Sequence, residues 1–209
     1  FGTADADFSR VDKARLVNAL ARVVPAASLL HDVEDLRPYE CDGMAALRQV
    51  PMVVVLPETE AQVVDILKIC AAQGVPVVAR GAGTGLSGGA QPHRFGLVVS
   101  LARLKKIVSI DAHARRAVVQ PGVRNLAISE AAAPYGLYYA PDPSSQIACT
   151  IGGNVAENSG GVHCLKYGLT IHNLLKVRGV SIAGGIVEFG SLALDAPGYD
   201  LLPLITGSE

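Results

Sequence analysis

A glycine-rich segment constrains this chain more than any other feature. Residues 79–89 read ARGAGTGLSGG and directly follow the apolar run 75–78. Five glycines fall within nine residues, so the backbone can adopt positive φ angles and turn its N–H groups towards one ligand. Such a nest of amides suits an anion, and no Asp or Glu occurs from Ile66 to Ile110. The segment therefore predicts a phosphate-binding loop, with a plain surface turn as the alternative.

One motif inside this segment points to a different fold. The residues from Gly83 to Gly88 match the G-x-G-x-x-G fingerprint of the Rossmann fold. That fold needs a helix at the glycines and an acidic residue about 20 positions further on. Pro92 and Gly96 oppose a long helix here, and the first carboxylate after the loop is Asp111. A Rossmann domain is therefore discounted, and a P-loop is excluded because no Gly-Lys-Ser or Gly-Lys-Thr follows.

Length, charge and cysteine usage narrow the class of protein. At 209 residues, half of them apolar, the chain can bury the core of one large domain or of two lobes. A net charge of −1 argues against a nucleic-acid or membrane-surface partner, and no apolar run approaches the length of a membrane span. No secretion signal is recognisable at the N-terminus. Four cysteines without a Cys-x-x-Cys pair predict free thiols and a cytoplasmic protein: Cys41, Cys70, Cys149 and Cys164.

The first half of the chain predicts a parallel β-α-β unit. Ser9 is placed to cap a helix that runs to about Val24, and a short helix is expected at residues 33–36. Residues 53–57 read as a buried strand. Residues 59–62 then form a capping box for a helix that stops at Gly74. The following strand, residues 75–79, delivers the glycine loop at its C-terminal end, where open α/β sheets bind their ligands.

Further strands are expected at residues 97–101, 107–111 and 117–120, followed by a helix from Arg124 or Asn125 to about Ala133, which completes the first lobe. The remainder of the chain predicts a different kind of sheet. A second stretch of small residues, 150–161, reads as another glycine-rich loop. Residues 177–182 and 186–189 read as an antiparallel hairpin. The fold class is therefore α+β, with an α/β lobe and a mainly antiparallel lobe.

Several ordered motifs resemble a known family. They are RGAGT at residues 80–84, TIGGN at 150–154, NSGG at 158–161, KYG at 166–168 and TGSE at 206–209, with further matches at 54–63 and 121–122. Together they resemble the FAD-binding domain of the vanillyl-alcohol oxidase type. Within it they are most similar to the D-subunits of bacterial glycolate oxidases and to D-lactate dehydrogenases.

The resemblance implies a domain organisation. A helical and irregular segment (1–52) precedes a first FAD-binding α/β lobe (53–140) and a second, incomplete lobe (141–209). FAD lies between the two lobes in this family. Since relatives continue beyond the position of Glu209, the resemblance describes a two-lobed domain truncated at its C-terminus. This piece alone is expected to hold FAD weakly or not at all and to oxidise no hydroxy acid.

Carried over residue by residue, the resemblance assigns three groups of cofactor-binding residues. The pyrophosphate group is Ala79, Arg80, Gly81, Ala82, Gly83, Thr84 and Gly85. The opposite wall and the isoalloxazine ring are assigned to Pro143, Ser144, Thr150, Gly152, Gly153, Asn154, Ala156, Asn158 and Ser159. The residues that close over the cofactor are Gly207, Ser208 and Glu209. The alternatives are that Arg80 forms an ordinary surface ion pair and that the other residues are turn or cap residues.

The resemblance also implies a chemistry. It describes an FAD-dependent oxidoreductase that acts on the CH–OH group of a small 2-hydroxy acid of the glycolate or D-lactate type, with hydride passing from the substrate Cα to flavin N5. Members that attach flavin covalently through this loop carry His where this chain has Thr84, so non-covalent FAD is expected. A non-catalytic nucleotide-binding or electron-transfer flavoprotein subunit with the same fold is the alternative.

No catalytic or metal-binding residue is assigned to this chain. In the family these residues lie in the C-terminal part, and His163 and His172 are read as structural. The resemblance further implies partner subunits in a redox complex, including an iron-sulfur subunit, with no nucleic acid and no membrane span. A cytoplasmic location is expected, with peripheral association with a membrane left open.

Overall fold

The protein divides into two compact units in the computed structural model, which describes residues 8–193 and 198–209. The first unit holds the described residues up to Arg80 together with Leu86–Ser100 and Val180–Gly185. The second holds Gly81–Gly85, Leu101–Gly179 and the described part of Ile186–Glu209. None of the helices in these described ranges is long and apolar enough to cross a membrane.

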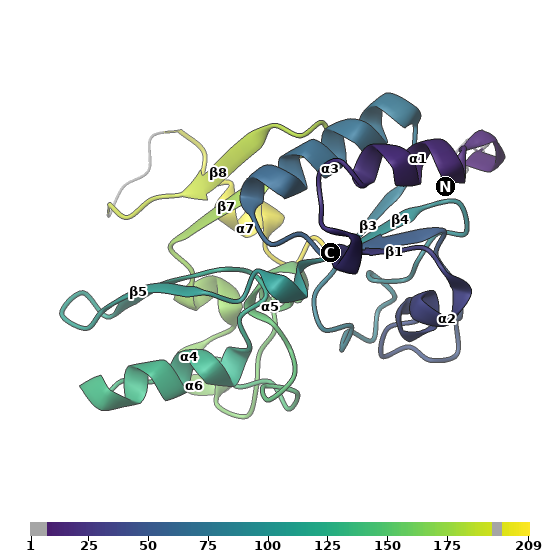
Figure 1. The fold of residues 1–209 in the computed structure, drawn as a ribbon. Coiled ribbons are helices and arrows are strands. Elements are labelled where there is room, and N and C mark those ends of the chain that lie inside the picture. The colour runs from purple at the N-terminus through teal and green to yellow at the C-terminus, as the bar shows by residue number, and fades with distance from the viewer. Residues whose placement is uncertain (1–7, 194–197) are drawn as a thin grey trace. The chain divides into compact units, whose positions relative to one another are not determined.

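A four-stranded sheet forms the centre of the first unit (Figure 1). Its strands are β1 (Leu29–Leu30), β2 (Val53–Val55), β3 (Val77–Arg80) and β4 (Leu97–Ser100), in the order β1-β2-β4-β3. β2 and β3 are both parallel to β4, and β1 is antiparallel to β2. Every residue of β2 and β4 is buried. Such runs are typical of parallel strands covered on both faces.

The predicted β-α-β unit is present with one difference. β2 leads through α3 (Glu60–Gln73) to β3. The Gln62 N–H donates to Thr59 Oγ1 at 3.2 Å, and Gln62 Oε1 accepts from the Glu58 N–H at 2.7 Å. Gly74 ends the helix at φ 62°. The predicted cap and stop are confirmed, but β4 lies between β2 and β3, which are therefore parallel without being neighbours.

Helices cover both faces of this sheet. α1 (Lys13–Leu20) contacts α3, and Figure 1 shows the two helices side by side. The prediction for α1 was wrong at both ends, because Asp12 rather than Ser9 accepts the capping bond from the Arg15 N–H and the helix ends at Leu20. α2 (Val33–Leu36) matches its prediction. Leu36 of α2 packs with Val54 of β2 and Val98 of β4 in a buried cluster.

In its described residues, the second unit contains two hairpins and four short helices. The hairpins are β5 (Ile107–Asp111) with β6 (Arg116–Val119), which is antiparallel, and β7 (Lys176–Val180) with β8 (Ile186–Gly190). The helices are α4 (Asn125–Ala132), α5 (Ile151–Glu157), α6 (Cys164–Tyr167) and α7 (Leu202–Ile205). Val123, Ile128 and Ile151 form a buried cluster that includes Ile107 and Val119 at its edge. This cluster joins the first hairpin to α4 and α5.

The two units differ from the boundaries expected at residues 52 and 140. Residues 8–52 contribute β1, α1 and α2 to the sheet unit. β5, β6 and α4 belong to the second unit, because their apolar side chains pack with Ile151 rather than with the parallel sheet. The change of unit falls at the glycine loop, since Arg80 belongs to the first unit and Gly81–Gly85 to the second.

Candidate cofactor site

The segment expected as a second glycine-rich loop is mostly helix α5, so that expectation was wrong. Asn154 donates its backbone N–H to the carbonyl of the N-cap residue Thr150 at 2.9 Å. A Cβ on Gly152 would lie 2.8 Å from the Cβ of Pro121 and 3.1 Å from its carbonyl oxygen. The helix thus uses its glycine to approach Pro121 closely, and this packing overrides the low helix propensity of glycine.

Gly81 faces the start of α5. A Cβ at Gly81 would overlap Thr150 Oγ1, and it would lie 3.9 Å from the backbone nitrogen of Gly153. Thr150 is only 6% exposed, and its Oγ1 has no hydrogen-bond partner within the described part of the chain. Leaving a buried hydroxyl unpaired costs about 1–3 kcal/mol. The cradle formed by these three residues therefore suits a ligand that accepts a hydrogen bond from the Thr150 hydroxyl.

The remainder of the loop runs along α5 towards its end. Gly83 has φ 69°, as the sequence predicted for a glycine nest. A Cβ at Gly85 would overlap Glu157 Oε1 and would lie 4.0 Å from Glu209 Oε1. Ala82 and Thr84, between the glycines, are exposed. The backbone of the loop thus lies against α5, while its side chains point to solvent.

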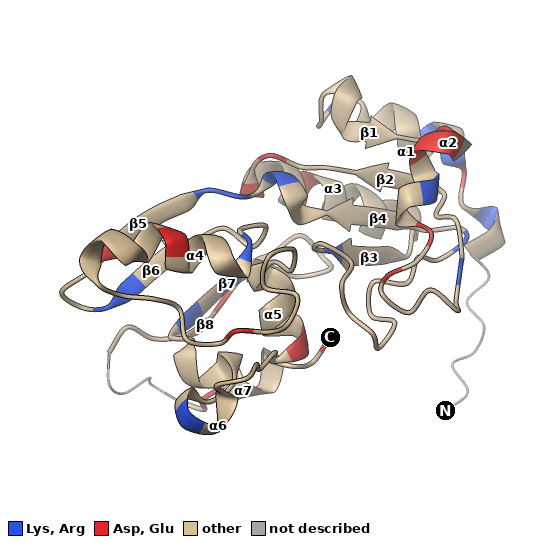
Figure 2. Ribbon diagram, turned by 90° about the horizontal axis from the view of Figure 1, so that it is seen from below, with Lys and Arg blue, Asp and Glu red and all other residues tan. Residues whose placement is uncertain are grey.

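The last residues of the chain pair with the end of α5. Gly207 donates its N–H to the Val155 carbonyl at 2.8 Å, and Glu209 donates to the Ala156 carbonyl at 3.1 Å. Figure 2 shows the C-terminus beside α5. Within the second unit the structure therefore brings together the loop, α5 and residues 207–209, which are parts of all three groups that the sequence assigned to cofactor binding.

The Asn154 side chain is committed to the interior. It is 2% exposed, its Oδ1 accepts from Asn125 Nδ2 at 2.9 Å, and its Nδ2 donates to Cys149 Sγ at 3.3 Å and to Ser159 Oγ at 3.4 Å. Asn125 Nδ2 also donates to the Pro141 carbonyl at 3.0 Å. The buried amide pair ties α5 to α4. Sequence reasoning missed Asn125, which it read only as a helix start.

The residues after α5 show the turn chemistry that was the alternative reading. Asn158 has φ 50°, and its Oδ1 accepts the N–H of Ile171 at 3.0 Å. The buried Thr170 donates its hydroxyl to the Ser159 carbonyl at 2.8 Å. These contacts fix the chain path out of α5. The other wall residues divide by exposure, since Pro143 is buried and Ser144 is exposed.

Arg80 is held inside the first unit. Its Nη1 donates to the Cys41 carbonyl at 2.7 Å, its guanidinium carbon lies 5.6 Å from the centre of the Tyr39 ring, and it is 9% exposed. The surface ion pair considered as its alternative role is therefore wrong, because the guanidinium is buried against a backbone carbonyl and an aromatic face. This contact anchors the strand residue that precedes the glycine loop.

His163 and His172 in the second unit have structural partners, as predicted. His163 Nδ1 lies 2.6 Å from Asp142 Oδ2, and this hydrogen bond lowers the pKa of Asp142 below its ordinary value of 3.8. His172 Nδ1 accepts the N–H of Leu169 at 3.0 Å. All four cysteines are free thiols. Within residues 8–193 and 198–209, no three His, Cys, Asp or Glu side chains gather as a potential metal site.

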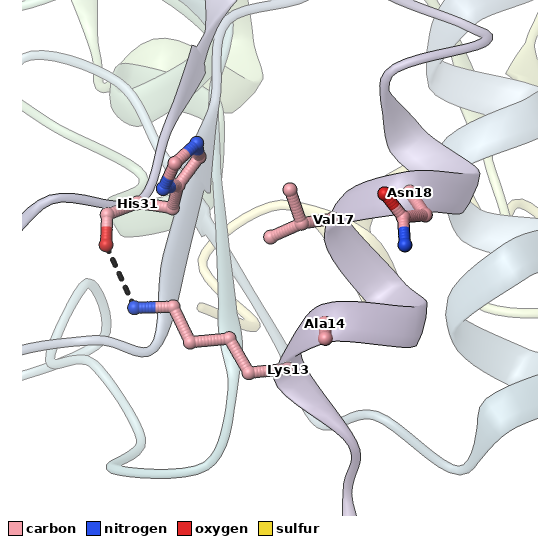
Figure 3. A pocket seen from close by; sticks show the side chains of 5 residues that line it. All are labelled: Lys13, Ala14, Val17, Asn18 and His31. Atoms are coloured by element: carbon pink, nitrogen blue, oxygen red, sulfur yellow. Dashed lines mark hydrogen bonds between the residues drawn. The ribbon is translucent and has the colours of Figure 1, made fainter.

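A pocket in the first unit is unrelated to these residues. It has a volume of about 380 Å³ and is lined by Lys13, Ala14, Val17, Asn18 and His31 (Figure 3). Lys13 Nζ closes one side by donating to the His31 carbonyl at 2.7 Å. None of the residues assigned from the sequence lines it, so the cradle at Gly81 and Thr150 remains the candidate site.

Comparison with known proteins finds relatives named as a glycolate oxidase subunit and as a D-lactate dehydrogenase. Glycolate oxidase subunit GlcD of Escherichia coli strain K12 is 60% identical over 199 residues, which cover 95% of this chain and 40% of that protein. D-lactate dehydrogenase of Archaeoglobus fulgidus is 39% identical over 158 residues, covering 75% of this chain and 35% of that protein. This chain therefore spans about 40% of the length of the former.

Solved structures agree in fold. An alkyldihydroxyacetonephosphate synthase superposes with a TM-score of 0.82 at 22% identity, over 93% of this chain and 37% of that one. At this identity the likeness concerns the fold alone. The protein family described as an FAD binding domain matches residues 51–190, well over half of the chain. The motifs had predicted an FAD-binding domain, and the chain is a member of the FAD binding domain family.

Proposed function

We propose that this chain is the FAD-binding part of a flavin-dependent dehydrogenase or oxidase of small 2-hydroxy acids, of the glycolate or D-lactate type. The observation that carries the proposal is the cradle at Gly81, where only a residue without a side chain fits beside the unpaired Thr150 hydroxyl. The names of the relatives, glycolate oxidase subunit and D-lactate dehydrogenase, supply the substrate class. Bound FAD supplies a hydride acceptor.

The residues at the candidate site have different roles in holding the cofactor. The backbone N–H groups of the loop that begins at Gly81 receive the pyrophosphate, and the Thr150 hydroxyl donates a hydrogen bond to it. Gly152 keeps α5 close to Pro121 and so fixes the position of Thr150. Arg80 holds the start of the loop through Cys41 rather than by pairing with a phosphate. Binding energy thus comes mostly from backbone groups fixed in place before the ligand arrives.

The cofactor is proposed to be bound without a covalent link. Thr84 is exposed on the loop and offers a hydroxyl in place of a nucleophilic ring nitrogen. Acid or heat denaturation should therefore release all flavin into the supernatant. Flavin fluorescence that stays with the precipitated protein would contradict non-covalent binding.

Partners and location are part of the same proposal. The relative of highest identity reported above is named as a subunit, which supports assembly with other subunits, and we propose an iron-sulfur subunit among them. The small 2-hydroxy acid is proposed to bind next to the cofactor in the assembled enzyme. A cytoplasmic location with peripheral association with a membrane is consistent with four free thiols.

A titration with FAD tests the proposal. FAD is added up to millimolar concentration so that weak binding is detected, and quenching of flavin fluorescence gives the dissociation constant. We expect Gly81→Ala to abolish binding, because the added methyl overlaps Thr150 Oγ1. Gly179→Ala is the matched control, since its methyl meets only Val187 Cγ2 at 3.9 Å. Equal affinity in Gly81→Ala and the parent would refute the role of the cradle.

A further inference from the structure

α5 and the glycine loop run side by side, so the two ends of the loop face different chemistry. The Gly81 end meets Thr150 and Gly153 at the start of α5. The Gly85 end meets Glu157, the last residue of the helix. Seven helical residues rise about 10 Å, and the four steps from residue 81 to residue 85 span at most about 14 Å. The two ends of the loop are therefore separate contact points along α5.

The Gly81 end is neutral and supplies a donor. The Thr150 hydroxyl is buried and unpaired, and an anion at this point would give it an acceptor. Its position is fixed by the backbone, because the neighbouring Ile151 N–H donates to the Val123 carbonyl at 2.8 Å. An anionic ligand therefore gains at the Gly81 end without meeting a like charge.

The Gly85 end carries two carboxylates. A Cβ on Gly85 would overlap Glu157 Oε1, and Glu209 Oε1 would lie 4.0 Å from that Cβ. The hydrogen bond from the Glu209 N–H to the Ala156 carbonyl, 3.1 Å long, fixes the backbone that carries the second carboxylate. Like charges a few ångströms apart repel, and near a protein surface this repulsion is several times stronger than in bulk water. A phosphate at Gly85 is therefore opposed.

We propose that Glu157 is a specificity-determining residue, which confines the anionic part of the ligand to the Gly81 end of the loop and repels it from the Gly85 end. The Gly85 end then accepts neutral parts of the ligand and hydrogen-bond donors, since carboxylates are acceptors. The inference rests on the proposed function, because it takes the loop to be the site of the pyrophosphate. It adds a residue that the family motifs did not assign.

The test compares an anion with a neutral flavin. Dissociation constants for inorganic pyrophosphate and for riboflavin are measured at low ionic strength in the parent, in Glu157→Gln and in Glu130→Gln. Glu157→Gln keeps the shape and removes the charge. Glu130 is a matched control, because it is an exposed carboxylate on α4 whose side chain is 58% exposed. We expect Glu157→Gln to bind pyrophosphate about three- to tenfold more tightly and riboflavin no more tightly than the parent does.

Salt provides a second readout. Raising the salt concentration to about 1 M shortens the screening length to about 3 Å, so the gain for pyrophosphate in Glu157→Gln should shrink towards the parent value. A gain that does not respond to salt would overturn the electrostatic explanation. A change of both ligands in the same direction, which a merely structural role would produce, would overturn the proposal, as would an unchanged affinity for pyrophosphate.

FAD binding separates this inference from the proposed function. If FAD binds the parent and Gly81→Ala abolishes it, while Glu157→Gln leaves pyrophosphate unaffected, the proposed function stands and the role of Glu157 is refuted. Because the chain alone is expected to hold FAD weakly or not at all, this comparison uses the full-length protein. If neither its parent form nor Glu157→Gln binds FAD or pyrophosphate, both are refuted. Support requires binding to the parent, tighter pyrophosphate binding in Glu157→Gln and no change in Glu130→Gln.

Discussion

The first unit is held by buried apolar side chains, whereas the second is held largely by close backbone approaches and buried polar bonds. Val53, Val54, Val55 and Val98 are all 0% exposed in the sheet. In the second unit, a Cβ on Gly161 would overlap the Asp142 carbonyl, and one on Gly122 would overlap the Leu101 carbonyl. The sheet should therefore tolerate apolar exchanges and reject charge, while the second unit should be sensitive to a single methyl group.

This difference suits the proposed binding of a cofactor. A loop that binds phosphate through its own N–H groups must come close to its ligand and to the elements behind it, and glycines permit both approaches. The described part of the sheet unit has fewer such approaches, among them that of Gly96 to the Pro76 carbonyl. It contributes the strand that ends at Arg80 just before the loop. Substitutions of buried apolar side chains in the sheet and of tightly packed glycines in the second unit therefore test the comparison directly.

The largest expected effect is a charge placed in the sheet. Val98→Asp should unfold the first unit, with a loss of about 4 kcal/mol or more, because the buried carboxylate finds no compensating charge beside Leu36 and Val54. The matched change in the second unit is Val118→Asp on β6, where the side chain is 54% exposed. It should cost within about 0.5 kcal/mol. Urea unfolding followed by circular dichroism measures both, and equal costs would break the comparison.

The same contrast explains what could be predicted from the sequence. β2, β3, β4 and α3 of the first unit could be predicted, because β-branched runs, the Thr59 cap and the Gly74 stop are local signals. The two-residue strand β1 was missed, since it lies in a stretch that was read as irregular. α5 could not, since two glycines lower its helix propensity and only the contact with Pro121 explains them. The unit boundary could not be predicted either, because it depends on Ile151 packing with distant residues.

The candidate site was predictable to a similar extent. The family motifs assigned residues that the structure brings close to α5: Gly81 lies beside Thr150, and Gly207 donates to the Val155 carbonyl. Their role in binding a cofactor stays a prediction. Side-chain roles were less accessible, since both the Asn154 amide and the Arg80 guanidinium are used inside the protein. No sequence pattern marks a partner such as Asn125, which lies 29 positions from Asn154. Hydrogen bonds between distant residues carry no local signal.

The second largest effect should come from the buried amide pair. Asn154→Ala removes the acceptor for Asn125 and the donor to Cys149, and it leaves a cavity, so we expect a loss of about 2–3 kcal/mol. Asn18→Ala on α1 is the control, because that side chain is exposed and should stay within about 0.5 kcal/mol. Urea unfolding gives both values. A small cost for Asn154→Ala would show that the amide pair does not hold α5 to α4.

A pair of glycines on α5 sharpens the comparison to a single methyl group. Gly152→Ala should destabilise the protein by about 1–3 kcal/mol, because the methyl would lie 2.8 Å from Pro121 Cβ and 3.1 Å from the Pro121 carbonyl. Gly153→Ala should stabilise it by about 0.5–1 kcal/mol, since its methyl meets only Thr150 Oγ1 at an ordinary 3.6 Å and alanine favours the helix. Thermal unfolding of the two variants should shift in opposite directions. Shifts in the same direction would contradict the close approach of α5 to Pro121.

The smallest expected effect is the pH dependence of one hydrogen bond in the second unit. The bond from His163 lowers the pKa of Asp142 in the folded protein below the ordinary 3.8 of an unfolded chain. Ionised Asp142 therefore stabilises the fold fully above about pH 4, and this contribution is lost as the pH falls through the lowered folded pKa. Asp142→Asn should be slightly less stable than the parent from pH 7 to pH 5, and the gap should close on acidification below pH 4.

Urea unfolding at several pH values measures this gap, with Asp65→Asn as the control in the other unit. Asp65 is an exposed carboxylate on α3. The difference in stability between Asp65→Asn and the parent should not close on acidification in the way expected for Asp142→Asn. The effect at Asp142 is small because both side chains reach solvent, with His163 63% exposed and Asp142 20% exposed. A gap that widens as the pH falls would mean that Asp142 prefers to be protonated in the fold. In that case the pair would not serve as a polar tie of the kind inferred for the second unit, and the segment would be held by the bond from Asn125 to the Pro141 carbonyl and by the close approach of Gly161 to the Asp142 backbone.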